Sequence, residues 1–124
     1  MLYTPSRIPG AWVIDVTKIS DARGFFAMTW LPNELSERGM NPSLAQCNFA
    51  YNTKRGTVRG MHFQKAPHAQ AKIIRATRGA LLDVIVDLRE DSPAFRQWDA
   101  VELEWPFAPE VISEKDRTWP LMVA

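Results

Sequence analysis

Hydrophobic and polar residues alternate with a period of two in several short runs, and Gly, Pro, Asn and Asp separate these runs. Alternate side chains of a strand point to opposite faces, so this period predicts strands with one apolar face. In the run from Leu82 to Leu88, for example, Leu82, Val84, Val86 and Leu88 are expected to share a face. The expected strands cover residues 12–16, 24–30, 45–51, 57–64, 71–78, 80–88 and 97–103.

The segment Pro32–Gly39 is the best helical candidate, because a proline stands near its start and a glycine at its end. Many short strands with one short helix predict an all-β fold, either a sandwich or a barrel. A length of 124 residues suits one domain and leaves no room for a second, so we expect a single domain over residues 1–124.

The composition narrows the possible partners. Hydrophobic residues make up 46% and charged residues 23%, which is typical of a soluble globular protein. A net charge of +1 gives no electrostatic reason to expect binding to nucleic acid or to a membrane surface. Cys47 is the single cysteine, so no intrachain disulfide is possible, and the start of the chain lacks the apolar core of a signal peptide. We therefore expect a cytoplasmic protein.

His62 is the first candidate for chemistry, because an imidazole can accept a proton near neutral pH. On a regular strand, Gly60, His62 and Gln64 would share a face, and a polar face inside a barrel is costly unless it meets a ligand or polar partners. Lys72 follows at a spacing that could place its ammonium group across from His62. A base beside an ammonium group suits proton abstraction next to a carbonyl. A hydrogen-bonded core histidine and a solvated lysine remain the alternatives.

Arg23 and Arg59 could hold a diphosphate with their planar guanidinium groups, although both could equally be ordinary surface arginines. Arg59 and His62 would share a strand face only if the strand carried a bulge, and Gly60 is its natural position.

Gln46 and Asn48 offer amides for recognition of a sugar or a base, or they line a solvated sheet face. A metal site is not expected, because Gln64 stands where a His-x-His pair would need its second histidine. The missing pair also disfavours a metal-dependent enzyme of another activity.

Six motifs stand in order over residues 10–103. They are Asp21–Phe26, Gln46–Asn48, Gly56–Gln64, Gln70–Lys72, Arg78–Arg89 and Ser92–Phe95. In this order and spacing they resemble the dTDP-4-dehydrorhamnose 3,5-epimerase family of cupin-like jelly rolls. The resemblance implies a cupin-like jelly-roll barrel for this chain.

The family's site residues transfer to matching positions. The resemblance implies that His62 removes protons beside the C4 ketone of a dTDP-linked 4-keto-6-deoxy-hexose and that Lys72 stabilises the enolate. It also implies substrate binding by a further set: Arg23, Phe26, Gln46, Asn48 and Arg59. No metal or organic cofactor is implied, since the ketone itself acidifies the neighbouring protons. Members of the family usually form homodimers that exchange N-terminal strands, and they serve deoxysugar and polysaccharide biosynthesis.

The chain also departs from the family. Residues 101–103 resemble a strand from the middle of the family's sequence, whereas residues 104–120 resemble its extreme C-terminal tail. This implies an internal deletion near Leu103–Glu104 and an incomplete barrel. By the same resemblance, the lost part would hold the tyrosine that acts as general acid and the aspartate that orients the base. Two functions follow: an epimerase acting at C3, C5 or both, or a non-catalytic remnant that binds sugar nucleotides.

Overall fold

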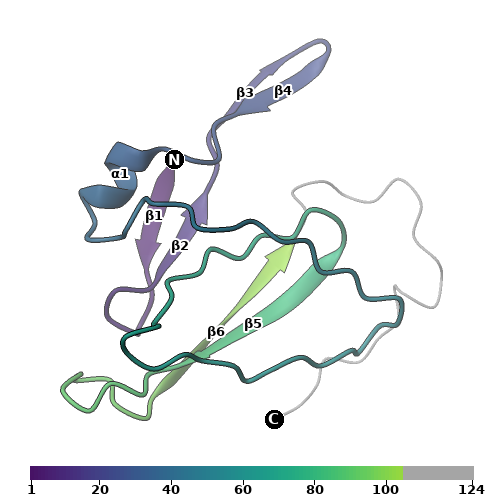
Figure 1. Cartoon of the computed structure of the whole chain (residues 1–124). Helices are drawn as coiled ribbons and strands as arrows, with labels where there is room; N and C mark the ends of the chain where they lie inside the picture. Colours follow the sequence, from purple (N-terminus) through teal and green to yellow (C-terminus); the bar gives the residue numbers. More distant parts are fainter. Residues whose placement is uncertain (105–124) are drawn as a thin grey trace.

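The structure, a computed structural model, describes residues 1–104, and strands make up most of the regular secondary structure in this part. The elements in chain order are β1 (Leu2–Pro5), β2 (Trp12–Asp15), β3 (Lys18–Asp21), β4 (Gly24–Ala27), α1 (Pro32–Ser36), β5 (Ala80–Val86) and β6 (Trp98–Glu104). Within this part the strands pair as three separate antiparallel hairpins, β1–β2, β3–β4 and β5–β6 (Figure 1). The expectation of an all-β fold with one short helix is confirmed.

The hairpin β1–β2 is closed by a turn that the sequence specifies. The Ala11 N–H donates to the Ile8 carbonyl at 3.0 Å across Pro9 and Gly10. Gly10 has a φ of 84°, which is the conformation that the third position of a type II turn requires, and proline suits the second position. Ile8 is buried at the tip of this turn. The apolar side chain of Ile8 in the N-terminal turn therefore faces the protein interior.

The hairpin β3–β4 projects from the rest of the described chain (Figure 1). Asp21 is paired with Gly24, so the loop consists of the two residues between them. The Arg23 N–H donates to the Asp21 carboxylate at 2.8 Å, as is common where an aspartate begins a tight turn. The sequence pattern predicts a turn here and the strand that follows it, but it does not predict β1 or β3.

The helix α1 is confirmed, although it ends at Ser36, three residues before Gly39. Proline occupies its first turn, and Gly39, with a φ of 73°, lies where the chain leaves the helix. Leu35 is only 1% exposed. The Arg38 guanidinium lies 3.9 Å from the centre of the Tyr3 ring and thereby joins the end of α1 to β1.

The hairpin β5–β6 is the longest, with seven residues in each strand. Leu82 is opposite Glu102, Val84 is opposite Ala100, and Val86 is opposite Trp98. Residues directly opposite each other share a face, so Leu82, Val84 and Val86 lie together on one side as the alternation predicts. The loop at residues 87–97 connects β5 to its partner β6, so the two paired strands are close along the chain.

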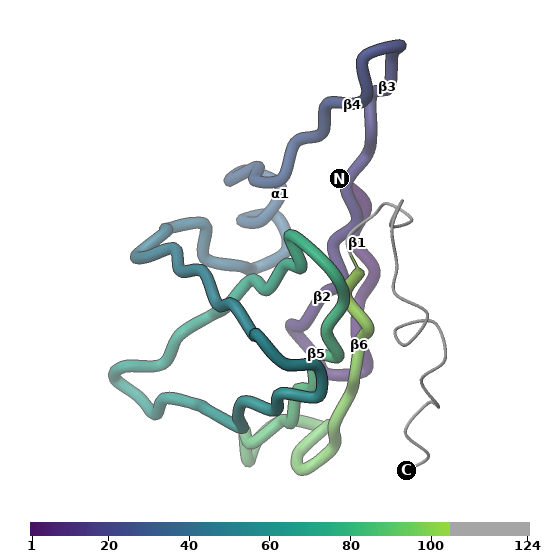
Figure 2. The backbone as a smooth tube through the Cα atoms, turned by 90° about the vertical axis from the view of Figure 1, so that its right-hand side faces the viewer, coloured from purple at the N-terminus to yellow at the C-terminus, as the bar shows by residue number. Residues whose placement is uncertain are grey.

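The three strands expected over residues 45–51, 57–64 and 71–78 are wrong for this structure. Residues 41–79 run as extended, irregular chain without a ladder partner among residues 1–104. Figure 2 shows this segment as a wide loop to one side of β5 and β6. Their alternation is suitable for strands, but a strand forms only where a neighbour satisfies its backbone groups. The described chain offers these three segments no such neighbour.

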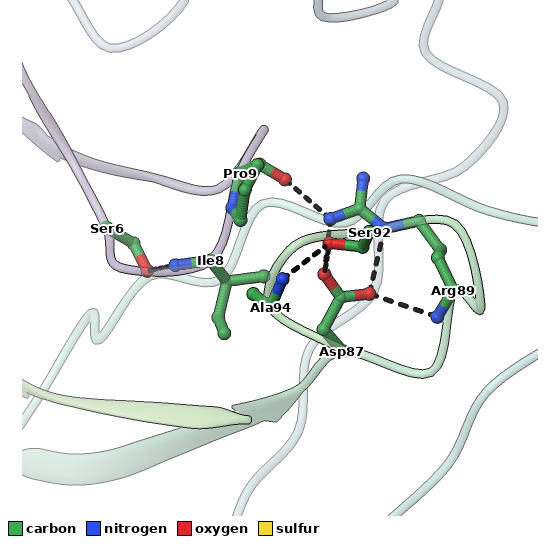
Figure 3. Close-up of polar contacts among 7 residues, drawn as sticks. All are labelled: Ser6, Ile8, Pro9, Asp87, Arg89, Ser92 and Ala94. Carbon is green, nitrogen blue, oxygen red and sulfur yellow. Dashed lines mark hydrogen bonds and ion pairs between the residues drawn. The ribbon is translucent and has the colours of Figure 1, made fainter. Parts of the chain in front are cut away.

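Two carboxylates tie distant parts of the chain together. Asp87, which is 3% exposed, accepts hydrogen bonds from the Arg89 guanidinium at 2.6 and 2.8 Å and from the Ser92 hydroxyl at 2.5 Å. Arg89 in turn donates to the Pro9 carbonyl at 2.7 Å (Figure 3). The Arg89 and Ser92 hydrogen bonds hold the pKa of Asp87 well below its ordinary value.

Asp99 on β6 makes the second tie. It accepts a hydrogen bond from the Ser6 hydroxyl at 2.8 Å and from the Arg7 guanidinium at 2.8 and 3.2 Å. These bonds also hold the pKa of Asp99 well below its ordinary value, with the Arg7 side chain as the largest cause. The N-terminal turn is therefore fastened to β5–β6 and its loop at two points.

Candidate functional site

Five of the seven predicted site residues lie on the irregular segment 41–79. Each of them is exposed: Gln46, Asn48, Arg59, His62 and Lys72. This exposure excludes the alternative in which His62 is a hydrogen-bonded core histidine. The segment presents the predicted base and its cationic neighbours to solvent, so their side chains are accessible to a ligand.

His62 follows a kink in the backbone. Gly60 has a φ of 120°, a conformation that side-chain-bearing residues rarely adopt. The bulge expected at Gly60 would need a strand ladder, and residues 57–64 form none within the described chain. In residues 1–104 the structure records no side-chain hydrogen bond or ion pair for His62 or Lys72. The pairing expected between these two side chains is therefore not formed in this structure.

Arg59 closes a local loop. Its Nε donates to the Asn52 side-chain oxygen at 2.8 Å, and the Thr57 hydroxyl donates to the Lys54 carbonyl at 2.7 Å. Gly56, with a φ of 72°, supplies the turn between them. The hydrogen bond to Asn52 thus holds the Arg59 guanidinium in this loop, three residues before His62.

Arg23 and Phe26 lie together on the projecting hairpin. Both border a shallow depression of about 270 Å³ whose lining also includes Asp21 and Ile19. Arg23 donates to the Asp21 carboxylate at 2.6 Å, and these hydrogen bonds lower the pKa of Asp21 and raise the pKa of Arg23. The guanidinium is 90% exposed, so it reaches solvent while one edge is engaged by Asp21.

A larger open depression, of about 660 Å³, lies where three parts of the chain meet. It is bordered by residues 8–11 of the N-terminal turn, by residues 63–66 directly after His62, and by residues 86–90 at the end of β5 and in the loop that follows. Gln64 lines this depression, whereas His62 and Lys72 do not. The structure therefore divides the predicted site residues between the projecting hairpin and the open segment.

The buried carboxylate of Asp87 and the half-buried carboxylate of Asp99 hold the scaffold together, and the sequence motifs do not indicate this role. A signal exists for Asp87: an arginine two residues on and a serine five residues on, within the run Asp87–Ser92. No comparable local signal exists for Asp99, because Ser6 and Arg7 are more than ninety positions away along the chain. Only the fold brings them together.

The structure gives two further findings about residues 1–104. No three His, Cys, Asp or Glu side chains of this part gather where they could hold a metal ion. No helix in the same part is long and apolar enough to cross a membrane.

The short strands, their pairing as antiparallel hairpins and the single short helix define the class of fold: an incomplete cupin-like barrel. The model of the dTDP-4-dehydrorhamnose 3,5-epimerase family matches residues 5–106, and the chain belongs to this family.

Similar proteins agree with this assignment. The dTDP-4-dehydrorhamnose 3,5-epimerase of Streptomyces griseus is 39% identical over 103 residues, which are 82% of this chain and 51% of that protein. The corresponding enzyme of Sinorhizobium fredii is 42% identical over 103 residues, 83% of this chain and 53% of that protein. The chain spans about half the length of the curated relatives it matches.

A crystal structure of dTDP-4-dehydrorhamnose 3,5-epimerase from Bacillus anthracis with TDP and PPi bound has the same fold. It is 40% identical, with a TM-score of 0.77 over 83% of this chain and 59% of that chain. The cupin-like fold expected from the sequence motifs is confirmed. The internal deletion near Leu103–Glu104 stays a prediction, and residues 105–124 lie outside the described part.

Proposed function

We propose that this protein epimerises a dTDP-linked 4-keto-6-deoxy-hexose at C3, C5 or both, without a cofactor. The observation that carries the proposal is His62, which stands in the family motif Gly56–Gln64 and has an exposed side chain. A general base must reach the carbon-bound proton of a docked substrate, and an exposed imidazole on an open segment meets this requirement.

In the proposed reaction, His62 takes the proton from the carbon next to the C4 ketone. The electron pair of the broken C–H bond moves into the bond toward C4, and the ketone oxygen becomes an enolate oxygen. The Lys72 ammonium group stabilises this negative charge. The bound substrate would bring the His62 and Lys72 side chains together, because both contact the same sugar ring. A water molecule then donates a proton to the carbon from the opposite face as the enolate returns to the ketone, which inverts the centre, and the hydroxide that remains takes up the proton held by His62.

The remaining site residues are proposed to hold the substrate. Arg23 and Phe26 share one depression, which suits a diphosphate beside an aromatic ring. Arg59, which lies on the segment 41–79, would bind the diphosphate, and the amides of Gln46 and Asn48 would position the sugar. The engaged edge of Arg23 is expected to stay with Asp21 while its solvent-facing nitrogens bind phosphate oxygens.

The absence of the family's tyrosine from the motifs of this chain leads to a sharper expectation. A base without an opposing acid can remove a proton and return a solvent deuteron to the same face. Exchange at C3 and C5 should then be faster than inversion. Proton NMR in heavy water measures both, because exchange removes a signal while inversion moves it.

The test compares the wild type with two histidine variants. His62→Ala should lower the exchange rate by about 10²–10⁴-fold, which is the usual contribution of a positioned general base. His68→Ala is the matched control, since it removes the other histidine from an exposed loop. Exchange that is equally fast in His62→Ala and the wild type would reject the proposal. Tight binding of dTDP without exchange would instead favour the non-catalytic remnant.

We also propose that the protein is a cytoplasmic homodimer that binds neither nucleic acid nor membranes. The projecting hairpin supports a dimer, because Ile19 is 64% exposed and Phe26 is 65% exposed there. Light scattering should give twice the chain mass of 14.1 kDa, and Ile19→Glu should give a single chain mass. A wild type that is monomeric throughout a concentration series would contradict the dimer.

A further inference from the structure

Positive charge is concentrated on the segment 41–79. This segment has no aspartate or glutamate, whereas residues 80–104 have seven acidic and two basic residues. The net charge of +1 for the whole chain therefore conceals a formal charge of +7 on one segment, which we call the cationic segment. Its seven bases are Lys54, Arg55, Arg59, Lys65, Lys72, Arg75 and Arg78.

The bases of the cationic segment keep their charge in the structure. All seven side chains are exposed, and the segment has no acidic residue of its own that would neutralise them. Arg59 donates to the side-chain oxygen of Asn52 at 2.8 Å, and Arg75 donates to the Thr29 carbonyl at 2.9 Å. Both acceptors are neutral, so each of these hydrogen bonds satisfies an N–H group without cancelling the positive charge.

The shape of the cationic segment allows its charges to act together. The segment forms a wide loop to one side of β5 and β6 (Figure 2). Charges of one sign along such a loop add their potentials in the space that they border and raise the local concentration of anions. At 0.1 M salt the Debye length is about 10 Å, so an anion near the loop is attracted mainly by the charges closest to it.

The proposed substrate is an anion, and part of its proposed site lies on this segment. Arg59 and Lys72 are the two cationic site residues there, and His62 stands between them along the chain. We propose that the other bases of the cationic segment steer the nucleotide diphosphate to this site and raise its association rate without contacting the bound substrate. The inference rests on the proposed function for the identity of the substrate.

A nucleic acid is the other class of anion that such a segment would attract. A small diphosphate is favoured, because the predicted base and two predicted substrate-binding cations share the loop with the steering bases. Steering changes the association rate and kcat/KM, and it leaves kcat at saturating substrate unchanged. This separation between the two kinetic parameters makes the proposal testable.

The test measures how fast the full 124-residue chain binds dTDP that carries a fluorophore on its ribose, by stopped-flow mixing in NaCl solutions. From about 0.01 M to about 1 M salt, the Debye length falls from about 30 Å to about 3 Å. The association rate should fall by about tenfold or more over this range, and the dissociation rate should change much less.

Charge-reversal variants identify the source of the attraction, because neutralising one of seven bases changes their sum only slightly. Arg55→Glu should lower the association rate at low salt by about threefold or more and should reduce its salt dependence. Adding Lys65→Glu should lower the rate further. Arg96→Glu is the matched control: Arg96 is exposed on the loop 87–97, and its reversal changes the net charge equally. This control should have a clearly smaller effect, and circular dichroism verifies the fold of each variant.

Three outcomes would overturn the proposal. They are the absence of dTDP binding, an association rate that salt does not change, and equal losses in Arg55→Glu and Arg96→Glu. Retention of duplex DNA that Arg55→Glu abolishes, with dTDP association unchanged, would also overturn it and assign the segment to nucleic acid. Salt-dependent dTDP association without deuterium exchange would instead reject the epimerase proposal alone, so the two failures are distinguishable.

Discussion

The N-terminal turn with β5–β6 and the segment 41–79 differ in how their polar groups are held. In the first region, Asp99 binds the side chains of the distant Ser6 and Arg7, and Asp87 holds Arg89, which donates to the distant Pro9 carbonyl. In the second, the candidate base His62 has no recorded side-chain partner in residues 1–104, and Arg59 is fixed only to its neighbour Asn52. The segment is tied to the rest of the chain by the Arg75 guanidinium, which donates to the Thr29 carbonyl at 2.9 Å, but the side chains of the candidate site are held by few contacts within residues 1–104.

This difference suits a segment that must accept a substrate. Regions with few buried contacts and many exposed backbone groups open at low free-energy cost, and binding segments are often drawn from them. The long-range ties of Asp87 and Asp99 keep the scaffold in place while the segment adapts. Substitutions in the two regions should thus have different effects: on stability in the first region and on isotope exchange in the second.

The largest effect is expected outside the segment 41–79, when residues 1–104 lose their most buried side chain, Leu35 of α1. Leu35→Ala should lower the free energy of unfolding by about 2–5 kcal/mol, because Leu35 is 1% exposed and its removal leaves a cavity. Denaturant titration followed by circular dichroism measures this change. The matched Leu2→Ala variant, at a 65% exposed position, should have a free energy of unfolding close to that of the wild type. An equal loss in both variants would refute the special role of the buried Leu35.

The next effect concerns the open segment. Lys72→Ala should slow deuterium exchange at C3 and C5 by about 10²–10³-fold, the usual consequence of removing one group that stabilises an oxyanion. The melting temperature should barely change, because the Lys72 side chain is exposed and makes no hydrogen bond or ion pair within residues 1–104. Lys54→Ala is the control, since only the backbone carbonyl of Lys54 accepts a hydrogen bond. Equal rates in the two variants would remove Lys72 from the mechanism.

A smaller effect is expected at the projecting hairpin. Arg23→Ala should weaken dTDP binding by about tenfold to a hundredfold, because a hydrogen bond to a charged group contributes about 1.5–3 kcal/mol. Isothermal titration calorimetry measures the affinity. Arg78→Ala, which removes another exposed arginine, should bind normally, and a similar loss in both variants would indicate a non-specific charge effect.

The smallest effect is a pH dependence of the scaffold. The pKa of Asp87 is lowered from its ordinary value of 3.8, so its ionised form stabilises the fold. This contribution is complete above pH 3.8 and is lost as the pH falls below that value. Asp87→Asn should be less stable than the wild type near neutral pH, and the two stability curves should converge in acid. A gap that widens as the pH falls would contradict the role of the ionised carboxylate.

The sequence predicts those elements whose partners are close along the chain. Pro32 and Gly39 mark α1, and the alternation from Ala80 to Val86 finds β5, whose partner β6 follows after one loop. The same kind of alternation from Ala45 to Tyr51 does not give a strand. A pattern reports which faces are apolar, but it cannot report whether a neighbouring strand is present.

The candidate site shows the same limit. The motifs name His62 and Lys72 through the family resemblance, and both are accessible, but their mutual approach depends on strand pairing that the described chain lacks. Arg23 lies in the tight hairpin turn and Phe26 lies on β4 directly after it, so both line one depression, a local relation that spacing can predict. The tie from Asp99 to Arg7 could not be predicted, because nothing local in the sequence links them.

The measurement closest to the central claim is deuterium exchange at C3 and C5 of the keto sugar in heavy water, with wild type, His62→Ala and His68→Ala side by side. Exchange should be fast in the wild type and in His68→Ala, and about 10²–10⁴-fold slower in His62→Ala. No exchange above the His62→Ala rate in the wild type would contradict the assignment of His62 as the base.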